Sequence, residues 1–150
     1  MRLGIISDTH GLLRPEAVAA LRGSDLIVHA GDVGKAEILE ALRGLAPVVA
    51  VRGNVDTADW ARELPHTATV QAGPAKIHVL HDLKELGAVP EGVSIVVTGH
   101  THKATQRERD GILYVNPGSA GPRRFRLPVT VACIELGLRP WPVEIVTLLP

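Results

Sequence analysis

The chain has 150 residues, of which 45% are apolar and only 3% aromatic, and its formal net charge is zero. This length fits one domain over residues 1–150 with an aliphatic core. The absence of net charge argues against a protein that grips duplex nucleic acid through a broad basic face. The single cysteine, Cys133, is expected to be a buried small hydrophobe. It allows no disulfide within the chain, which is typical of a reducing compartment.

The first residues run directly into a predicted strand and lack the pattern of a signal peptide. No apolar run approaches the roughly 18 residues that a membrane span requires. We therefore expect a cytoplasmic protein that does not partner with membranes.

The first third of the chain alternates predicted strands and helices. Strands are expected at Arg2–Ser7, Asp25–Ala30 and Pro47–Val51, and helices at Pro15–Arg22 and Lys35–Arg43. Proline at the first helical position and glycine after the last support the helix boundaries. The β-α-β-α-β order implies parallel strands joined by right-handed crossovers.

The remainder is dominated by short β-rich runs separated by turn residues. Strand pairs are predicted at Thr67–Ala72 with Lys76–Leu80, Thr105–Arg109 with Ile112–Val115, and Val129–Glu135 with Val143–Leu148. A short helix over Asp82–Gly87 and a buried strand over Ser94–Thr98 lie between them. We expect the second half to be antiparallel. Two sheets packed face to face with helices outside would form a layered α/β sandwich, and a single mixed sheet is the alternative.

Five predicted strands end in side chains that can bind a metal ion. These side chains belong to seven residues: Asp8, His10, Asp32, Asn54, His81, His100 and His102. A single Asp-x-His or His-x-His is weak evidence, but the same arrangement at five strand ends is hard to attribute to chance. The carboxyl ends of parallel strands are where such sheets bind ligands. The sequence therefore predicts a metal site at these strand ends.

The number and type of these residues indicate two metal ions. Seven ligands exceed the four of a tetrahedral zinc, whereas two ions can share a bridging carboxylate. Oxygen and imidazole donors without thiolate suit Mn, Fe, Co, Ni or Zn. Two divalent ions outweigh the two carboxylates of Asp8 and Asp32, so the cavity should attract an anion such as a phosphate ester. Two metals can also hold a hydroxide and stabilise both oxygens of an in-line displacement.

The motifs, in chain order, resemble the calcineurin-like metallophosphoesterase superfamily. They are Asp8-Thr9-His10, Gly31-Asp32, Gly53-Asn54-Val55-Asp56, His81 and Gly99-His100-Thr101-His102. The short length and the Asn116-Pro117-Gly118-Ser119 loop resemble its small YfcE-type phosphodiesterase branch. The resemblance implies a four-layer α/β/β/α sandwich of two mixed β-sheets flanked by helices. It also implies that one metal ion is held by Asp8, His10, Asp32 and His102, and that Asp32 bridges to a second ion completed by Asn54, His81 and His100.

The activity implied by the resemblance is metal-dependent phosphodiester hydrolysis by a hydroxide that bridges two metal ions, without a covalent intermediate. Asp32, Asn54 and His100 are the expected catalytic residues. Manganese is the expected metal, with nickel, iron, cobalt or zinc as alternatives. The substrate would be a small phosphate ester or a nucleotide, contacted by Asn54, Thr101 and Arg123. A homo-oligomer is compatible with the sequence. The alternative functions are a phosphomonoesterase or nucleotide phosphatase of the same chemistry, and a non-catalytic interaction scaffold resembling the retromer subunit.

Two positions depart from the family pattern. Val55 stands where many members have a histidine thought to protonate the leaving group. The small phosphodiesterase branch also lacks this histidine. Because valine cannot donate a proton, we expect a preference for leaving groups that need little help. Asp82 follows His81 where the branch often has glycine. It could support an imidazole, contact substrate or cap a helix, and we favour the cap.

Neighbouring polar residues are expected to support this site. Asp56 should brace its loop, and His29 should be packed within its strand or support a ligand. A basic cluster follows the 116–119 loop at Arg123, Arg124 and Arg126. A solvated basic face is the default interpretation, and Arg123 could instead steer an anionic substrate.

Overall fold

The computed structural model describes residues 1–150 and contains two five-stranded β-sheets. The first sheet has the spatial order β10 (Val143–Leu149), β9 (Val129–Glu135), β1 (Arg2–Ile6), β2 (Leu26–His29), β3 (Val48–Ala50). Strands β1, β2 and β3 pair in parallel, as the alternating pattern predicted, and β9 pairs antiparallel to both β1 and β10. The closing hairpin of the chain thus completes the sheet that the first third begins.

The second sheet has the spatial order β4 (Thr67–Ala72), β5 (Ala75–Leu80), β6 (Ile95–Val97), β8 (Ile112–Asn116), β7 (Thr105–Arg109). The predicted hairpins β4–β5 and β7–β8 are confirmed. The prediction that the second half is antiparallel is wrong at its centre, because β5, β6 and β8 pair in parallel. All three residues of β6 are buried, as is typical of a parallel strand covered on both faces.

The two sheets pack face to face around an aliphatic core. Leu3 and Ile5 of β1 belong to one buried cluster with Ile77 of β5 and Ile95 of β6. Ile6, the next residue of β1, belongs to a second cluster on the opposite face of its sheet. This alternation follows from the two-residue period of a strand. Burial on both faces explains why these strands are continuous apolar runs rather than alternating ones.

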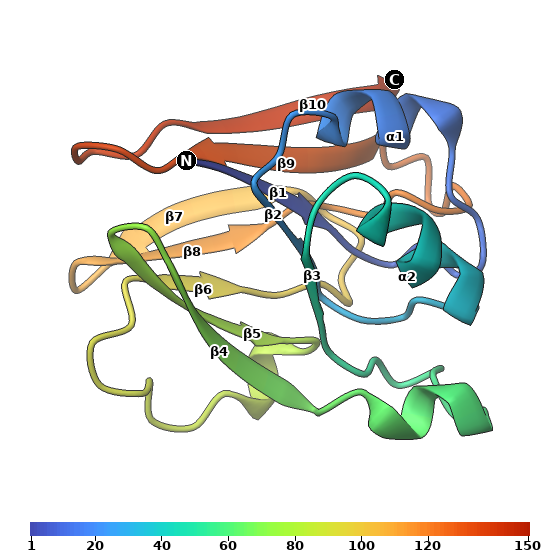
Figure 1. Ribbon diagram of the computed structural model, residues 1–150, viewed down its shortest axis with the longest axis horizontal. Helices are drawn as coiled ribbons and strands as arrows, with labels where there is room; N and C mark the ends of the chain where they lie inside the picture. Colours follow the sequence, from blue (N-terminus) through green and yellow to red (C-terminus); the bar gives the residue numbers. More distant parts are fainter.

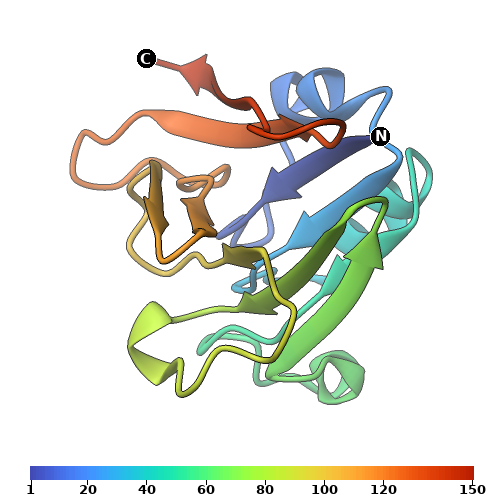
Figure 2. The ribbon, with the colours of Figure 1, turned by 90° about the vertical axis from the view of Figure 1, so that its left-hand side faces the viewer.

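Helices cover the outer face of the first sheet. Helices α1 (Pro15–Leu21) and α2 (Ala36–Arg43) pack on it through a shared buried cluster, with the second sheet on the other side (Figures 1 and 2). The expected layered sandwich is confirmed. The outer layer on the second sheet is thin, since the predicted 82–87 helix is only a 3-10 turn, η2 (Leu83–Glu85). Leu86 and Val89 after it pack on that sheet. A second 3-10 turn, η1 (Asp59–Glu63), follows β3.

The loops that follow β1, β2, β5 and β6 lie on the same side of the molecule (Figure 1). Backbone hydrogen bonds join them: Asp8 N donates to Gly31 O at 3.0 Å, and Gly99 N donates to His81 O at 2.9 Å. His100 N donates to Asp8 Oδ2 at 3.1 Å and thereby connects the two sheets. This end of the sandwich therefore gathers the residues predicted to bind metal.

None of the helices combines the length and the apolar character that a membrane-spanning segment requires.

Candidate metal centre

Six of the seven predicted ligands gather in two clusters at this end. In each cluster, one ligand atom from every residue lies within 4.8 Å of the others. Asp8, His10 and His102 form the first cluster, and Asp32, His81 and His100 form the second. His100 and His102, which are two residues apart, therefore serve different clusters.

Asp32 joins the two clusters. Its Oδ2 atom lies 3.1 Å from His81 Nε2 in its own cluster and 3.7 Å from His10 Nε2 in the other. Asp8 Oδ1 lies 3.3 Å from His102 Nε2, 3.7 Å from His10 Nε2 and 3.9 Å from His81 Nε2. The two carboxylates and three of the imidazoles thus face one shared space.

Several atoms that face this space are buried and have no hydrogen-bond partner. They include Asp8 Oδ1, His10 Nε2 and His81 Nε2. A buried polar atom without a partner costs roughly 1–3 kcal/mol, so a fold rarely retains several together. Bound divalent ions would coordinate these atoms, and a mixture of carboxylate and imidazole donors suits such ions. The residues present therefore fit the metal centre that the sequence predicted.

Most of these ligands occupy a backbone conformation that is rare outside glycine. The φ angles are 56° at Asp8, 47° at His10, 56° at Asp32, 73° at His100 and 64° at His102. A left-handed conformation costs an L-residue roughly 1–2 kcal/mol. Strain of this kind persists where the surrounding structure enforces it, commonly at functional sites. It turns the chain sharply after each strand and directs these side chains to the same place.

His81 is oriented by a backbone carbonyl. Its Nδ1 atom lies 2.7 Å from Ala30 O, so Nδ1 carries the donated proton and Nε2 faces Asp32. Burial alone would raise the pKa of Asp32, but His81 and the Val55 N–H, which donates to Asp32 Oδ1 at 3.0 Å, lower it to about 2. Burial opposes protonation of His81, yet Asp32 and Asp8 raise its pKa to about 8.

Asp8 is held by donors on one side only. Ser7 Oγ donates to Asp8 Oδ2 at 2.7 Å, and His100 N donates to the same atom. Burial tends to raise the pKa of Asp8, but the nearby His10 imidazole and the hydrogen bond from Ser7 lower it below its ordinary value. Oδ2 is thereby occupied and Oδ1 is left for a metal ion. Sequence analysis missed Ser7, for which adjacency to Asp8 was the only signal.

His29 connects the loops that follow β1 and β2. Gly31 N donates to His29 Nδ1 at 3.1 Å, so the neutral ring carries its proton on Nε2, which lies 3.0 Å from Thr9 Oγ1. Thr9 Oγ1 in turn donates to Val33 O at 2.8 Å. Full burial lowers the pKa of His29 to about 4. This histidine supports the ligand loops, one of the roles expected for it.

Asp56 braces the adjacent loops, as expected. Its carboxylate accepts hydrogen bonds from Val33 N at 3.2 Å, Gly34 N at 3.1 Å and Gly53 N at 2.9 Å. Gly53 is confined for a further reason, because a Cβ atom there would collide with the Asp32 carboxylate. The loop that contains Asn54 is therefore locked against the loop that contains Asp32.

A second brace comes from the loop after β8. Asn116 Nδ2 donates to Gly99 O at 2.9 Å and to Thr101 Oγ1 at 3.1 Å, and Ser119 Oγ donates to Asp8 O at 3.1 Å. Sequence analysis used this loop only for the family resemblance and did not predict these contacts. They join residues 15 to 111 positions apart.

Asn54, the seventh predicted ligand, lies beside the two clusters. Asn54 lines a cavity of about 320 Å³ beside His81 and His100, together with Arg52 and His66. None of its lining residues is hydrophobic. Such a wall suits a polar or anionic ligand.

The candidate substrate contacts Thr101 and Arg123 are both exposed. Thr101 Oγ1 is already engaged by Asn116. Burial lowers the pKa of His102, the Asp8 carboxylate opposes that shift, and the His10 imidazole and the Arg124 guanidinium lower the pKa further. A steering role for Arg123 therefore stays a prediction.

Asp82 has two partners. Its side chain accepts a hydrogen bond from Lys84 N at 3.1 Å, which is the predicted cap, here on a 3-10 turn. Its Oδ2 atom also lies 3.8 Å from His100 Nε2. The cap that we favoured therefore forms, and the same carboxylate lies beside the His100 imidazole without hydrogen-bonding to it.

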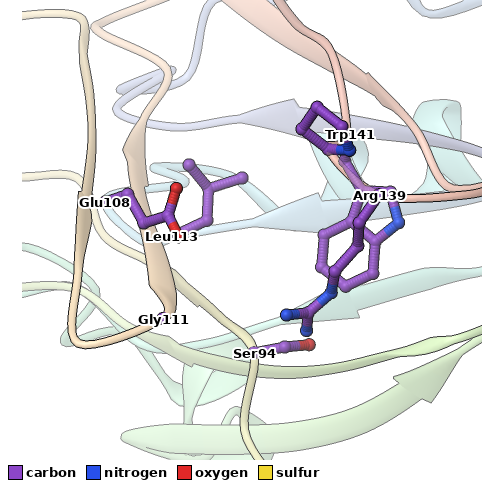
Figure 3. Close-up of a pocket in the computed structure, with 7 residues that line it drawn as sticks. Ser94, Glu108, Gly111, Leu113, Arg139 and Trp141 are labelled. Carbon is purple, nitrogen blue, oxygen red and sulfur yellow. The ribbon is translucent and has the colours of Figure 1, made fainter.

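Another cavity, of about 300 Å³, lies by the β7–β8 turn and the β9–β10 connection (Figure 3). Its wall includes Ser94, Glu108 and Leu113, and the Arg139 guanidinium lies 4.5 Å from the centre of the Trp141 ring. It contains none of the predicted ligands.

Known proteins resemble this chain over most of its length. The family model for the calcineurin-like phosphoesterase superfamily domain matches residues 1–137. A probable metallophosphoesterase of Methanocaldococcus jannaschii is 38% identical over 135 residues, covering 79% of this chain and 68% of that protein. The E. coli phosphoesterase YfcE superposes with a TM-score of 0.76 at 23% identity, covering 99% of this chain and 93% of that one. Chaetomium thermophilum Vps29 superposes with a TM-score of 0.77 at 18% identity, covering 98% and 96%.

Proposed function

This chain belongs to the calcineurin-like phosphoesterase superfamily, and we propose that it is a metal-dependent phosphodiesterase with two divalent ions at the centre described above. The family predicted from the sequence motifs is confirmed. One observation above all supports the proposal: Asp32, a member of one ligand cluster, also lies beside the other, and several ligand atoms around it are buried and have no hydrogen-bond partner. That arrangement is expected of a carboxylate shared by two ions.

We assign the ligands as the sequence motifs implied. Asp8, His10 and His102 would hold one ion, Asn54, His81 and His100 would hold the other, and Asp32 would be shared. Two bound ions would supply Lewis-acid activation of water and of the phosphoryl oxygens for in-line displacement, without a covalent intermediate. Manganese remains the metal we expect, with nickel, iron, cobalt and zinc as alternatives that the same oxygen and imidazole donors suit.

The chain's own residues prepare the site for this chemistry. The lowered pKa values of Asp8 and Asp32 keep both carboxylates ionised at neutral pH. The Ala30 carbonyl keeps His81 Nε2 directed inward. His100 and Asn54 lie at the mouth, where the polar cavity can admit and orient a phosphate ester. Asp32, Asn54 and His100 are therefore the residues to which we assign catalytic roles.

Val55 indicates that the substrates are diesters with stabilised leaving groups. Its backbone N–H holds Asp32, while its side chain is 47% exposed next to the centre. An aliphatic side chain at this place can neither protonate a leaving oxygen nor contact a second phosphate charge. Leaving groups that depart without a proton should therefore react fastest.

The proposal is tested by metal removal and reloading. Protein stripped with a chelator and reloaded with Mn²⁺ should hydrolyse bis(4-nitrophenyl) phosphate faster than 4-nitrophenyl phosphate, and elemental analysis should find about two ions per chain, as a shared carboxylate allows. Chelator, and His100→Ala, should abolish turnover.

Other results would change the assignment. Faster turnover of the monoester would identify a phosphomonoesterase or nucleotide phosphatase. Full turnover after complete metal removal would exclude metal-dependent hydrolysis. No bound metal and no turnover would favour the interaction scaffold. A cytoplasmic location, which the single cysteine favours, and a homo-oligomer belong to the same proposal and are tested by fractionation and sedimentation.

A further inference from the structure

The segment after β8 carries Arg-Arg-Phe-Arg at residues 123–126, which we call the basic loop. Phe125 is the only phenylalanine in the chain, and it is 88% exposed. In a chain with so few aromatic residues, a phenylalanine would be expected in the core. Its placement in solvent between arginines therefore requires an explanation other than folding.

The backbone of the basic loop holds Phe125 at the tip of a turn. Leu127 N donates to Arg124 O at 2.9 Å, and the two residues between them have φ angles of 54° at Phe125 and 61° at Arg126. Two successive left-handed residues are ordinarily glycine, asparagine or aspartate. A bulky residue at such a position is an outlier, and outliers of this kind cluster at functional sites.

The stem of the loop is fixed to the metal centre. Ser119 Oγ donates to Asp8 O at 3.1 Å, and Arg14 donates to Gly121 O from Nε at 3.4 Å and from Nη2 at 3.2 Å. A Cβ atom at Gly121 would collide with the carbonyl oxygens of Asp8 and Thr9. The chain that leads into the basic loop thus packs directly on the first ligand turn.

This combination has a recognised chemistry. Arginine forms bidentate contacts with phosphate oxygens, and an exposed aromatic ring stacks on nucleic-acid bases of any sequence. A merely solvated basic face would need the arginines but not the strained phenylalanine. A scissile phosphate at the metal centre would carry its nucleoside and any neighbouring phosphate toward whatever surface adjoins the centre.

We infer that the basic loop binds the nucleoside side of a nucleotide diester, with Phe125 stacking on the base and the flanking arginines contacting phosphate oxygens. The inference rests on the proposed phosphodiesterase function and specifies its substrate class. It places the selectivity for nucleotides on the Asp8 side of the centre, in a loop that contains no metal ligand.

Two diesters with the same leaving group test the inference in Mn²⁺-loaded protein. Thymidine 5′-(4-nitrophenyl phosphate) and methyl 4-nitrophenyl phosphate both release 4-nitrophenolate, and they differ in the nucleoside. Phe125→Ala should lower kcat/KM for the thymidine ester about tenfold through KM, as expected for one lost stacking contact, and leave the methyl ester within about twofold. Phe125→Trp should retain the thymidine preference.

The chain offers a matched control. Leu138 is 95% exposed and lies in the connection between β9 and β10, which is at the opposite end of the sandwich from the metal centre (Figure 1). Leu138→Ala removes a comparable exposed apolar side chain and should leave kcat/KM unchanged for both esters.

A binding measurement provides a readout apart from turnover. We expect calorimetry on the Mn²⁺-loaded protein to show that Phe125→Ala weakens the binding of thymidine 5′-monophosphate about tenfold, which corresponds to the loss of one stacking contact. The affinity for methyl phosphate should be unchanged. Equal losses on both esters, or unchanged nucleotide kinetics and binding, would overturn the inference; the second result is also what a protein-docking role for Phe125 would give.

The two proposals fail separately. If the wild-type protein hydrolyses neither ester, the phosphodiesterase function is excluded, and the binding of thymidine 5′-monophosphate then decides the inference alone. Binding that depends on Phe125 would support a nucleotide-binding loop, and binding that does not would overturn it.

Discussion

The two ends of the sandwich are built from the same strands but differ in backbone strain. At the end where β1, β2 and β6 terminate, five residues with positive φ angles are candidate metal ligands, and two more, Phe125 and Arg126, lie in the basic loop. At the other end, the β7–β8 turn uses Asp110 and Gly111 for its positive φ angles, which are the residues such a turn prefers. The turn residues at the β7–β8 end thus suit their backbone conformation, whereas those at the other end adopt a strained conformation that directs candidate ligands to one place.

The ends also differ in how their polar groups are paired. Four of the six buried side-chain atoms without partners belong to Asp8, His10, His81 and His102. At the cavity by the β7–β8 turn, Trp141 Nε1 donates to Gly137 O at 2.9 Å. The Arg139 guanidinium covers the Trp141 ring there (Figure 3). A cavity alone therefore does not indicate a metal site; convergent buried atoms that lack partners do.

The strongest way to break this comparison is to exchange an aspartate at each end. Asp32→Asn should lower kcat/KM for bis(4-nitrophenyl) phosphate at least about a thousandfold, or about 4 kcal/mol, because it removes the carboxylate proposed to be shared. Elemental analysis should show fewer than two ions. Asp110→Asn, in the β7–β8 turn, should stay within about twofold, since asparagine suits that conformation. An Asp32→Asn protein with both ions and near-normal turnover would contradict the assignment.

Next in size is the loss of the Asp56 brace. Asp56→Asn leaves one acceptor oxygen where three N–H groups now donate, and should lower the free energy of unfolding by about 3 kcal/mol. Urea unfolding of the metal-free protein measures this loss. Asp25 is the control, because it is exposed and accepts one bond from Arg2 N at 2.7 Å. If Asp56→Asn cost no more than Asp25→Asn, the brace would be unimportant.

The third prediction uses the buried His29. Because its folded pKa of about 4 lies below the ordinary value of 6.5, the folded state binds fewer protons than the unfolded state. Its contribution to stability is therefore complete above pH 6.5 and is lost as the pH falls toward 4. Between pH 6.5 and 5 the metal-free protein should lose about 2 kcal/mol from this group.

His29→Asn isolates that contribution, since the other histidines are unchanged in the variant and cancel in the comparison. Asp8 and Asp32 do not interfere, because their pKa values are lowered below 3.8 and they titrate at lower pH. The difference in unfolding free energy between the two proteins should narrow from pH 6.5 to 5. Parallel pH profiles would show that His29 is not the group that titrates.

The smallest expected effect compares one ion pair at each end. Asp82 Oδ2 lies 3.8 Å from His100 Nε2, and both side chains are partly exposed. Such pairs stabilise a structure by less than about 1 kcal/mol. Asp82→Asn should therefore change KM for the diester less than about fivefold. Asparagine should also keep the cap. Glu135→Gln removes the exposed pair with Arg2 at 3.6 Å at the other end and should leave KM unchanged. A large loss with Asp82→Asn would move Asp82 into the metal centre.

The amino-acid sequence by itself determined the family, the strands and which residues could bind metal. These follow from local information: β-rich runs such as 95–97 predict strands, and Asp8, His81 or His100 directly after such a run identifies a ligand by type and position. The aliphatic core and the hairpins of the second half were predictable for the same reason.

Only the tertiary structure decided how those pieces combine. The parallel pairing of β6 with β5 and β8, the division of His100 and His102 between two clusters and the braces from Asn116 and Ser119 all join residues far apart in the chain. Such contacts form because buried polar groups must find partners wherever the packed sheets bring them together, and no local pattern carries that information.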